Sequence, residues 1–465
     1  MVPEAREAIA SEFEGAELGD RRRTQRLLEV AGVLARDPSL SFPKAMSDDA
    51  GLEGTYRLLN NPGVVASQIL APHQRATMER CAGLGTVLVA HDTTAFGFEG
   101  ESTRSGLGPI SNGRRQGFFA HVSLVVSADE ERLPLGVIAA NTWARSGRKP
   151  KMRAEKRSLQ PDRESKRWFE QVQEVEDRMA PHVHAIHVMD REGDAYETLS
   201  RLHTSRLGFV VRSAHDRRLL GAQPLLSDAL ESLKHRCERE VPLARRIGSK
   251  MPRGRVIHPP RHTRVARLAF SASRVDFERP RYADKSLPKE VSLNVVHVLE
   301  LDAPSGEKPV EWVLFTSESV ETPEDILRVV DIYRARWTIE EFFKALKTGC
   351  SFEERQLESL HALKNALAIF LPIAWRLLLL RSLSRQEADV PADLALTPTQ
   401  LEVLRAVAKQ PLPAQPTAKQ ALLAIAALGG HIKNNGQPGW QVLARGYHDL
   451  LLLELGWIAR EKSDQ

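Results

Sequence analysis

The sequence predicts an α/β fold built on a mixed sheet that helices cover. Continuous apolar and β-branched runs are typical of buried strands, and they occur at residues 86–90, 118–127, 133–140, 184–189 and 208–212. Helical patterns cover residues 164–179 and 195–202. Strands that first follow one another and then alternate with helices favour a mixed sheet with helices packed against it.

The composition is typical of a multidomain protein in a reducing compartment. A chain of 465 residues is too long for one simple core. Its net charge of +5 hints at a polyanionic partner, and its three cysteines lie too far apart for a disulfide framework. The first residues are charged and lack an apolar signal core, and the longest apolar stretch, residues 367–380, is too short to span a bilayer. We therefore expect a cytoplasmic protein without a membrane partner.

Residues 1–70 are expected to form an N-terminal helical domain. A helix should begin at Arg21, and Arg22, Arg23 and Arg26 crowd its first turns. Positive charges at this end of a helix oppose the helix dipole. An external phosphate backbone would compensate for that cost, whereas the alternative is a solvated charged face.

Residues 71–380 are expected to form the central domain, with a β-rich insertion at about 214–320. Between Arg236 and Arg267 the sequence has nine Arg and one Lys but only two Glu. Such a segment is usually solvated or disordered, yet beside strands it is also a plausible phosphate-tracking surface. Extended runs in the insertion cover residues 265–272, 291–299 and 310–316.

Residues 381–465 are expected to form a C-terminal helical domain.

A long helix is expected to end near Gly349, because Thr322 can cap its start and glycine favours its stop. At about 100° per residue, one face of this helix carries a phenol, a guanidinium, a carboxylate and an ammonium group. An ordinary ladder of ion pairs on a surface helix is the alternative interpretation. The four residues in this row are Tyr333, Arg336, Glu340 and Lys347.

Two aspartates follow strand candidates. Asp92 ends the first apolar run, and Asp190 follows residues 184–189, with Glu192 and Asp194 as competing acids. Taken singly, each aspartate is more often a turn or cap residue. Together with Glu340, the two strand-end aspartates could hold one or two divalent metal ions, as phosphoryl transfer requires. This combination indicates an enzyme that acts on phosphodiester bonds.

The spacing of the four residues on the helix resembles the signature of the DDE transposases of insertion-sequence family four. The similarity extends over nearly the whole chain in the same order and departs most in residues 381–420. The matching segments are Gly19-Asp20, Arg22-Arg23-Thr24, Tyr56-Arg57, Asp92-Thr93-Thr94, Asp190-Arg191-Glu192, Phe209-Val210-Val211-Arg212-Ser213, Trp312, residues 314–318 and the helix itself.

The resemblance implies a ribonuclease-H-like core in which Asp92, Asp190 and Glu340 are the catalytic carboxylates. They would bind two Mg²⁺ ions, for which Mn²⁺ could substitute. Trp312 would stack on a flipped base, and Trp337 would help to line that pocket. The residues implied to contact DNA are Tyr333, Arg336, Lys347, Trp312, Trp337, Arg212, Arg22, Arg23 and Arg26.

The same resemblance implies a cut-and-paste transposase that hydrolyses DNA at transposon ends, forms and reopens a hairpin, and joins the end to target DNA. Its partners would be transposon-end double-stranded DNA, target DNA and a second copy of the chain, in a prokaryotic cytoplasm close to the nucleoid. A nuclease of the same fold without strand transfer and an inactive DNA-binding relic are the alternatives. The retained carboxylates argue against the relic. Trp312 together with the set Tyr333, Arg336 and Lys347 argues against the simple nuclease, because simple cleavage needs no hairpin stabiliser.

Overall fold

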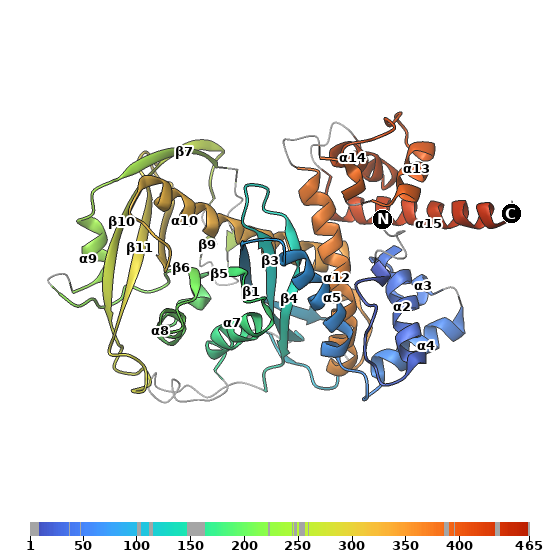
Figure 1. Cartoon of the computed structure of the whole chain (residues 1–465), viewed down its shortest axis with the longest axis horizontal. Coiled ribbons are helices and arrows are strands. Elements are labelled where there is room, and N and C mark those ends of the chain that lie inside the picture. The colour runs from blue at the N-terminus through green and yellow to red at the C-terminus, as the bar shows by residue number, and fades with distance from the viewer. Residues whose placement is uncertain are drawn as a thin grey trace.

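The computed structural model describes residues 9–36, 38–46, 48–99, 104–110, 115–146, 163–221, 224–243, 245, 249–250, 256–258, 260–385, 390–394, 396–432 and 438–463. Several residues of the basic segment singled out between Arg236 and Arg267 lie outside these ranges. Figure 1 shows a β-rich end with β7, β10 and β11, and an opposite end built from helices of both chain termini, with α12 running between the sheet and those helices.

One ten-stranded mixed sheet organises the chain, and its main strand order is β2-β3-β1-β5-β6-β12-β11-β10-β7, with β4 paired to β3. The pairs β1–β5 and β5–β6 are parallel, whereas the other pairs in this sheet are antiparallel. The first strands are β1 (Thr86–Phe98), β2 (Gly108–Pro109), β3 (Gln116–Ser127), β4 (Pro134–Trp143), β5 (His184–Met189) and β6 (Gly208–Arg212).

Strands β4, β3, β1, β5 and β6 form a ribonuclease-H-like core. Three antiparallel strands come first in the chain, and two strands parallel to β1 follow, each connected through a helix. The helices α7 (Lys166–Arg178) and α8 (Tyr196–Thr204) make these connections, and α7 packs on β3 and β4. Apolar residues on both faces of β1 are buried, which explains why the central strands read as continuous apolar runs.

The expected β-rich segment extends the core sheet rather than standing apart from it. Strand β12 pairs with β6 through Leu314 and Arg212, and β11, β10 and β7 follow outward. The elements of this segment are α9 (Leu226–Glu231), β7 (Cys237–Leu243), β8 (Ser249–Lys250), β9 (Val256–His258), β10 (Arg264–Glu278), β11 (Glu290–Glu300) and β12 (Glu311–Thr316), of which β8 and β9 pair separately.

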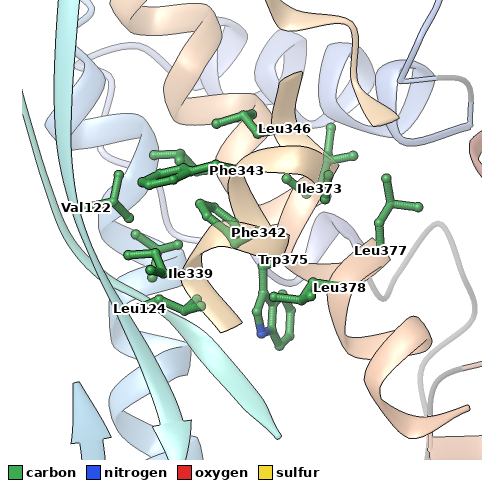
Figure 2. Packing of buried hydrophobic residues seen from close by; sticks show 14 of the residues in the cluster. Val122, Leu124, Ile339, Phe342, Phe343, Leu346, Ile373, Trp375, Leu377 and Leu378 are labelled. Atoms are coloured by element: carbon green, nitrogen blue, oxygen red, sulfur yellow. The ribbon is translucent and has the colours of Figure 1, made fainter. Parts of the chain in front are cut away.

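The long helix expected before Gly349 is divided into three parts. Helix α10 (Pro323–Ala335) starts at the predicted Thr322 cap, which forms a capping box with Asp325. Arg336 separates it from α11 (Trp337–Lys344), and a π-helical turn (Ala345–Gly349) follows. Figure 2 shows Ile339, Phe342, Phe343 and Leu346 wedged between β3 residues and apolar side chains of α12.

Helix α12 (Leu360–Leu383) forms the centre of the helical side of the molecule. Among the described helices, it is the one long and apolar enough to cross a membrane by length and composition, but 78% of its most apolar stretch is buried inside the fold. It packs on α4, α5, α11 and α14. The helices at the two ends of the chain are α2 (Arg21–Arg36), α3 (Phe42–Ala45), α4 (Asp49–Asn60), α5 (Ala66–Cys81), α13 (Pro398–Val407), α14 (Ala418–Leu428) and α15 (Trp440–Ser463).

Candidate active site

Asp92 and Asp190 lie next to each other where β1 and β5 separate. The last paired residues of these parallel strands are His91 and Met189, so the two aspartates occupy the next position on each strand. Asp190 leaves β5 and caps a short 3-10 turn, where its Oδ1 accepts the Glu192 N–H at 2.8 Å. The prediction that Asp92 ends its strand is wrong, because β1 continues beside β3 as far as Phe98.

Arg336 joins Asp92 to Glu340. Its Nη1 donates to Asp92 Oδ2 at 3.0 Å, and its Nη2 donates to Glu340 Oε1 at 2.5 Å. The arginine is only 6% exposed, whereas Glu340 is half-buried. The structure therefore brings the three predicted carboxylates to one place, with a guanidinium between two of them.

The electrostatics of this cluster show a surplus of negative charge. Burial, the neighbouring Asp190 carboxylate and, more weakly, Glu340 raise the pKa of Asp92 to about 7, although Arg336 acts in the opposite direction. Burial alone would lower the pKa of Arg336, but the acidic groups around it hold that pKa above its ordinary value. One guanidinium thus compensates only part of the charge of three carboxylates.

The oxygen donors suit a hard divalent cation, and the surplus charge favours one. Among the described residues, no set of three His, Cys, Asp or Glu side chains lies close enough to hold a metal ion. Arg336 is bonded to both Asp92 and Glu340, and so occupies carboxylate oxygens that a metal ion would use. Asp92 and Asp190 fit as the first two ligands, and Glu340 could join them once its bond to Arg336 opens.

The competing acids have different surroundings. Asp194 is fully buried, forms an ion pair with Arg217, and accepts the Ala214 N–H at 2.6 Å. It is therefore part of the packing between the end of β6 and the core. Glu192 remains exposed next to Asp190 and is not committed to such a bond in the described structure.

A basic cleft of about 520 Å³ opens beside Glu340. Trp312 lies in its wall, with the Arg212 guanidinium 5.9 Å from the indole centroid, and Trp337 is 53% exposed. Arg212 was predicted from sequence, and Arg239 and Arg261 belong to the basic segment that the sequence offered as a phosphate-tracking surface. Three further basic residues of this wall were missed: Arg191, Lys308 and Arg334.

Arg191 could have been found from sequence, since it follows Asp190 directly. Lys308 comes from the loop before β12 and Arg334 from α10, and the extended sheet brings them beside Arg239 of β7 and Arg261 before β10. Pairing limits some of them: Arg239 and Arg334 both bind Asp331.

The expected row along one helix is not formed as predicted. Tyr333 is only 1% exposed and packs edge-on against Trp312, with ring centroids 5.5 Å apart. Lys347 lies in the π-helical turn, which changes the direction of its side chain relative to the expected row. Its Nζ donates to Ala95 O at 2.7 Å. Its ammonium group therefore reaches β1 three residues beyond Asp92, and burial lowers the pKa of this ammonium.

The N-terminal arginines lie on α2, which packs on α4, α12 and α15 on the helical side of the molecule, away from β1 and β5 (Figure 1). The side chain of Arg22 is 92% exposed and pairs with Asp20. Arg23 donates to Leu18 O at 3.1 Å, and Arg26 pairs with Glu29 at 3.0 Å. The three predicted DNA contacts thus differ in how freely they could meet a phosphate.

A ribonuclease-H-like sheet with carboxylates where β1 and β5 separate defines a class of enzymes that cut or join nucleic acids. Two family models match this chain and narrow that class. Residues 5–64 match the family described as "Transposase DNA-binding", and residues 165–373 match the one described as "Transposase DDE domain". The chain therefore contains a transposase DNA-binding domain and a DDE transposase domain. The second match includes Asp190 and Glu340, whereas Asp92 precedes it.

Proposed function

We propose that the protein is a cut-and-paste DNA transposase whose catalytic groups are Asp92, Asp190 and Glu340. The observation that carries this proposal is the convergence of these carboxylates beside a basic cleft lined by Trp312. The matched DNA-binding and DDE domains support the same class. Divalent metals are typical of DDE domains, and we propose Mg²⁺ as the physiological ion, with Mn²⁺ able to replace it.

The proposed reaction begins with hydrolysis at the transposon end. Water adds to phosphorus, the P–O3′ bond breaks, and the end keeps a free 3′-OH while the flanking strand keeps a 5′-phosphate. The 3′-OH then attacks the opposite strand, so that one phosphodiester bond forms as another breaks and a hairpin results. A second hydrolysis opens the hairpin, and the same 3′-OH finally attacks target DNA.

A metal ion held by the carboxylates would activate the water and stabilise the departing oxygen. Side chains of the protein would supply the other interactions with the DNA. Arg336, once released from Glu340, would neutralise charge on a nearby phosphate. Arg212 and Arg191 would hold the backbone along the cleft, and Trp312 would stack on an unpaired base while the hairpin forms.

We also propose that α2 reads the transposon end, that two copies of the chain act together through their C-terminal helices, and that the protein works in the cytoplasm near the nucleoid. The exposed side chain of Arg22 and the match of residues 5–64 support the first proposal. Leu452 and Leu453 support the second, because both are substantially exposed on α15.

The decisive experiment is a time course with Mg²⁺ and a duplex that carries the terminal sequences of the element encoding this chain. A transposase gives a nick, then a hairpin, then a double-strand break. Breaks without a hairpin would indicate the simple nuclease, and binding without cleavage would indicate the relic.

Variants of the three carboxylates test their role in the same assay. Asp92→Asn, Asp190→Asn and Glu340→Gln should each abolish cleavage and leave DNA binding largely intact. Glu192→Gln is the matched control, because this exposed acid lies beside Asp190 and should be dispensable. Near-normal cleavage by any of the first three variants would remove that residue from the catalytic set.

A further inference from the structure

Three buried histidines lie on the strands around the two aspartates: His91 on β1, His187 on β5 and His121 on β3. His91 and His187 are completely buried, and His121 is nearly so. His91 precedes Asp92 on β1, and because successive side chains alternate along a strand, its imidazole lies on the opposite face of the sheet from the Asp92 carboxylate. Neither imidazole of the His91–His187 pair has a part in the chemistry proposed above.

The hydrogen bonds of this network run in one direction. Asn141 Nδ2 donates to Gln171 Oε1 at 2.7 Å, which fixes the orientation of the Gln171 amide. Gln171 Nε2 then donates to Ser123 Oγ at 2.9 Å. A buried hydroxyl keeps its own hydrogen bonded, and the hydroxyl of Ser123 lies 2.9 Å from His91 Nδ1, so it donates there.

The two imidazoles continue the same direction. Since His91 Nδ1 accepts, its proton lies on Nε2, which donates to His187 Nδ1 at 2.8 Å. His187 in turn carries its proton on Nε2 and donates to Glu176 Oε1 at 2.9 Å. Glu176 lies on α7, where its side chain is 33% exposed. Each histidine therefore carries a proton on Nε2 and accepts at Nδ1, and the series of hydrogen bonds ends at a carboxylate near the surface.

The position of the His91–His187 hydrogen bond allows it to fix the spacing of β1 and β5 beside the two aspartates. It crosses from β1 to β5 at the last paired positions, immediately before the strands separate and present Asp92 and Asp190. The network also reaches β3 through Ser123 and α7 through Glu176. Apolar side chains could fill this space, but they would not fix a single strand spacing as the directed series of hydrogen bonds from Asn141 to Glu176 does.

We propose that His91 and His187 are positioning residues, which hold β1 and β5 at the separation that lets Asp92 and Asp190 share a divalent cation. This inference rests on the proposed function only for the identity of the ligands. Partners behind metal ligands commonly influence metal affinity by about 10–100-fold. The network acts here through the backbone of the ligands and from the far face of the sheet.

The test is Mn²⁺ binding to the full-length protein without DNA, measured as the loss of the free-ion signal in electron paramagnetic resonance. His187→Leu should weaken binding about tenfold or more. His187→Gln should stay close to the unmodified protein, because the amide can accept from His91 and donate to Glu176. His184→Leu is the matched control, since this exposed histidine begins the same strand outside the network.

A second variant distinguishes a loss of strand positioning from a loss of folding. Glu176→Leu removes the acceptor at the partly exposed end of the network and should weaken Mn²⁺ binding in the same direction, with a normal circular dichroism spectrum. A third measurement does not depend on metal: ¹⁵N spectra of the imidazoles at neutral pH should show His91 and His187 protonated at Nε2.

Unchanged Mn²⁺ affinity in both His187→Leu and Glu176→Leu would overturn the inference, as would Nδ1-protonated imidazoles. These outcomes are separate from failure of the proposed function. If the unmodified protein binds Mn²⁺ but cuts no DNA, the transposase proposal fails, and the positioning role is still decided by the Mn²⁺ titrations.

Discussion

Arg336 is the residue on which the state of the site depends. It is bonded to both Asp92 and Glu340, so it neutralises part of their charge and occupies oxygens that a cation would need. The raised pKa of Asp92, about 7, shows that this neutralisation is incomplete. A divalent cation and the guanidinium should therefore compete for the same carboxylate oxygens.

We predict that Arg336→Gln abolishes cleavage but increases the stabilisation that Mg²⁺ gives to the protein. Without the guanidinium, the carboxylates repel each other and only a bound cation relieves that repulsion, so affinity for the ion and the ligand-induced rise in melting temperature both increase. The measurement is a thermal melt at pH 8 with and without millimolar Mg²⁺.

Arg334→Gln is the control for this experiment, because Arg334 lies two residues earlier and pairs with Asp331 instead. It should show the same Mg²⁺ effect as the unmodified protein. An equal Mg²⁺ effect in Arg336→Gln would mean that the guanidinium does not compete with the cation.

The residue scale also shows what sequence can predict about such a site. The meeting of Asp92 and Asp190 was predictable, since both follow apolar runs that become neighbouring strands. The bond from Arg336 to Asp92 was not, because 244 positions separate the two residues and helical spacing describes only the Arg336–Glu340 half of the contact. The buried histidines carried no signal of their own, since an isolated histidine in an apolar run usually belongs to the core.

At the scale of elements, most of the strand and helix predictions lie close to the observed bounds, and the long helix is the instructive exception. A uniform turn of 100° per residue placed Tyr333 and Lys347 in one row, but the helix is interrupted at Arg336 and ends in a π-helical turn. Tertiary contacts decide both features: Tyr333 packs against Trp312, and Lys347 binds the Ala95 carbonyl.

Trp312 on β12 gives a prediction at this scale. It is partly buried, with Tyr333 on one side and Arg212 within 5.9 Å. We predict that Trp312→Ala nicks transposon-end DNA at a near-normal rate but forms little hairpin, because stacking contributes about 1–3 kcal/mol per base. A time course that resolves nick, hairpin and break, run beside a thermal melt, measures both properties.

A purely structural role for Trp312 would give a different result. Truncating a core tryptophan costs about 3–5 kcal/mol of stability, so nicking and hairpin formation would fall together with a large drop in melting temperature. Trp337→Ala supplies a comparison in the same cleft, because this largely exposed side chain can be removed with little effect on folding.

Helix α2 gives a second prediction. Replacing Arg22, Arg23 and Arg26 with Ala should lower the log–log salt dependence of DNA binding by about one unit for each lost phosphate contact. The contacts of these arginines differ, so their single variants should differ too. Arg22→Ala should change the salt slope without changing stability. Arg23→Ala should also lower the melting temperature, since Arg23 is bonded to Leu18 O.

The measurement is fluorescence anisotropy with end DNA over a range of salt concentrations, combined with thermal melts of the single variants. An unchanged slope in the triple variant would assign these arginines to a solvated surface of the helix.

At the scale of the whole molecule, a buried charge cluster ties the N-terminal region to the catalytic core. Glu12 accepts a bond from His73 of α5 and another from Arg80 Nη1 at 2.8 Å. His73 also reaches β4, where its Nε2 accepts the Val137 N–H at 3.0 Å. His73 carries a proton on Nδ1, and burial lowers its pKa although Glu12 acts in the opposite direction. None of these long-range contacts follows from local sequence patterns.

The charge of Glu12 depends on these partners. Burial alone would raise its pKa, but the hydrogen bond and charge interaction with His73, followed by those with Arg80, outweigh burial and lower the pKa from 4.5 to about 2. A carboxyl group with a lowered pKa in the folded state stabilises that state fully above its unfolded pKa. This stabilisation is lost as the pH falls from about 4.5 to about 2, and at its largest it is on the order of 3 kcal/mol.

We predict that Glu12→Gln lowers the melting temperature at neutral pH and flattens the decline of stability between pH 4.5 and 2, because the variant has no carboxyl group to protonate there. Glu14→Gln is the matched control, since that residue is exposed and its substitution should leave the acid decline unchanged. The measurement is a series of thermal melts across this pH range, together with limited proteolysis to show whether the N-terminal helices separate first. Parallel acid declines in the Glu12→Gln variant and the unmodified protein would mean that this cluster does not hold the N-terminal region on the core.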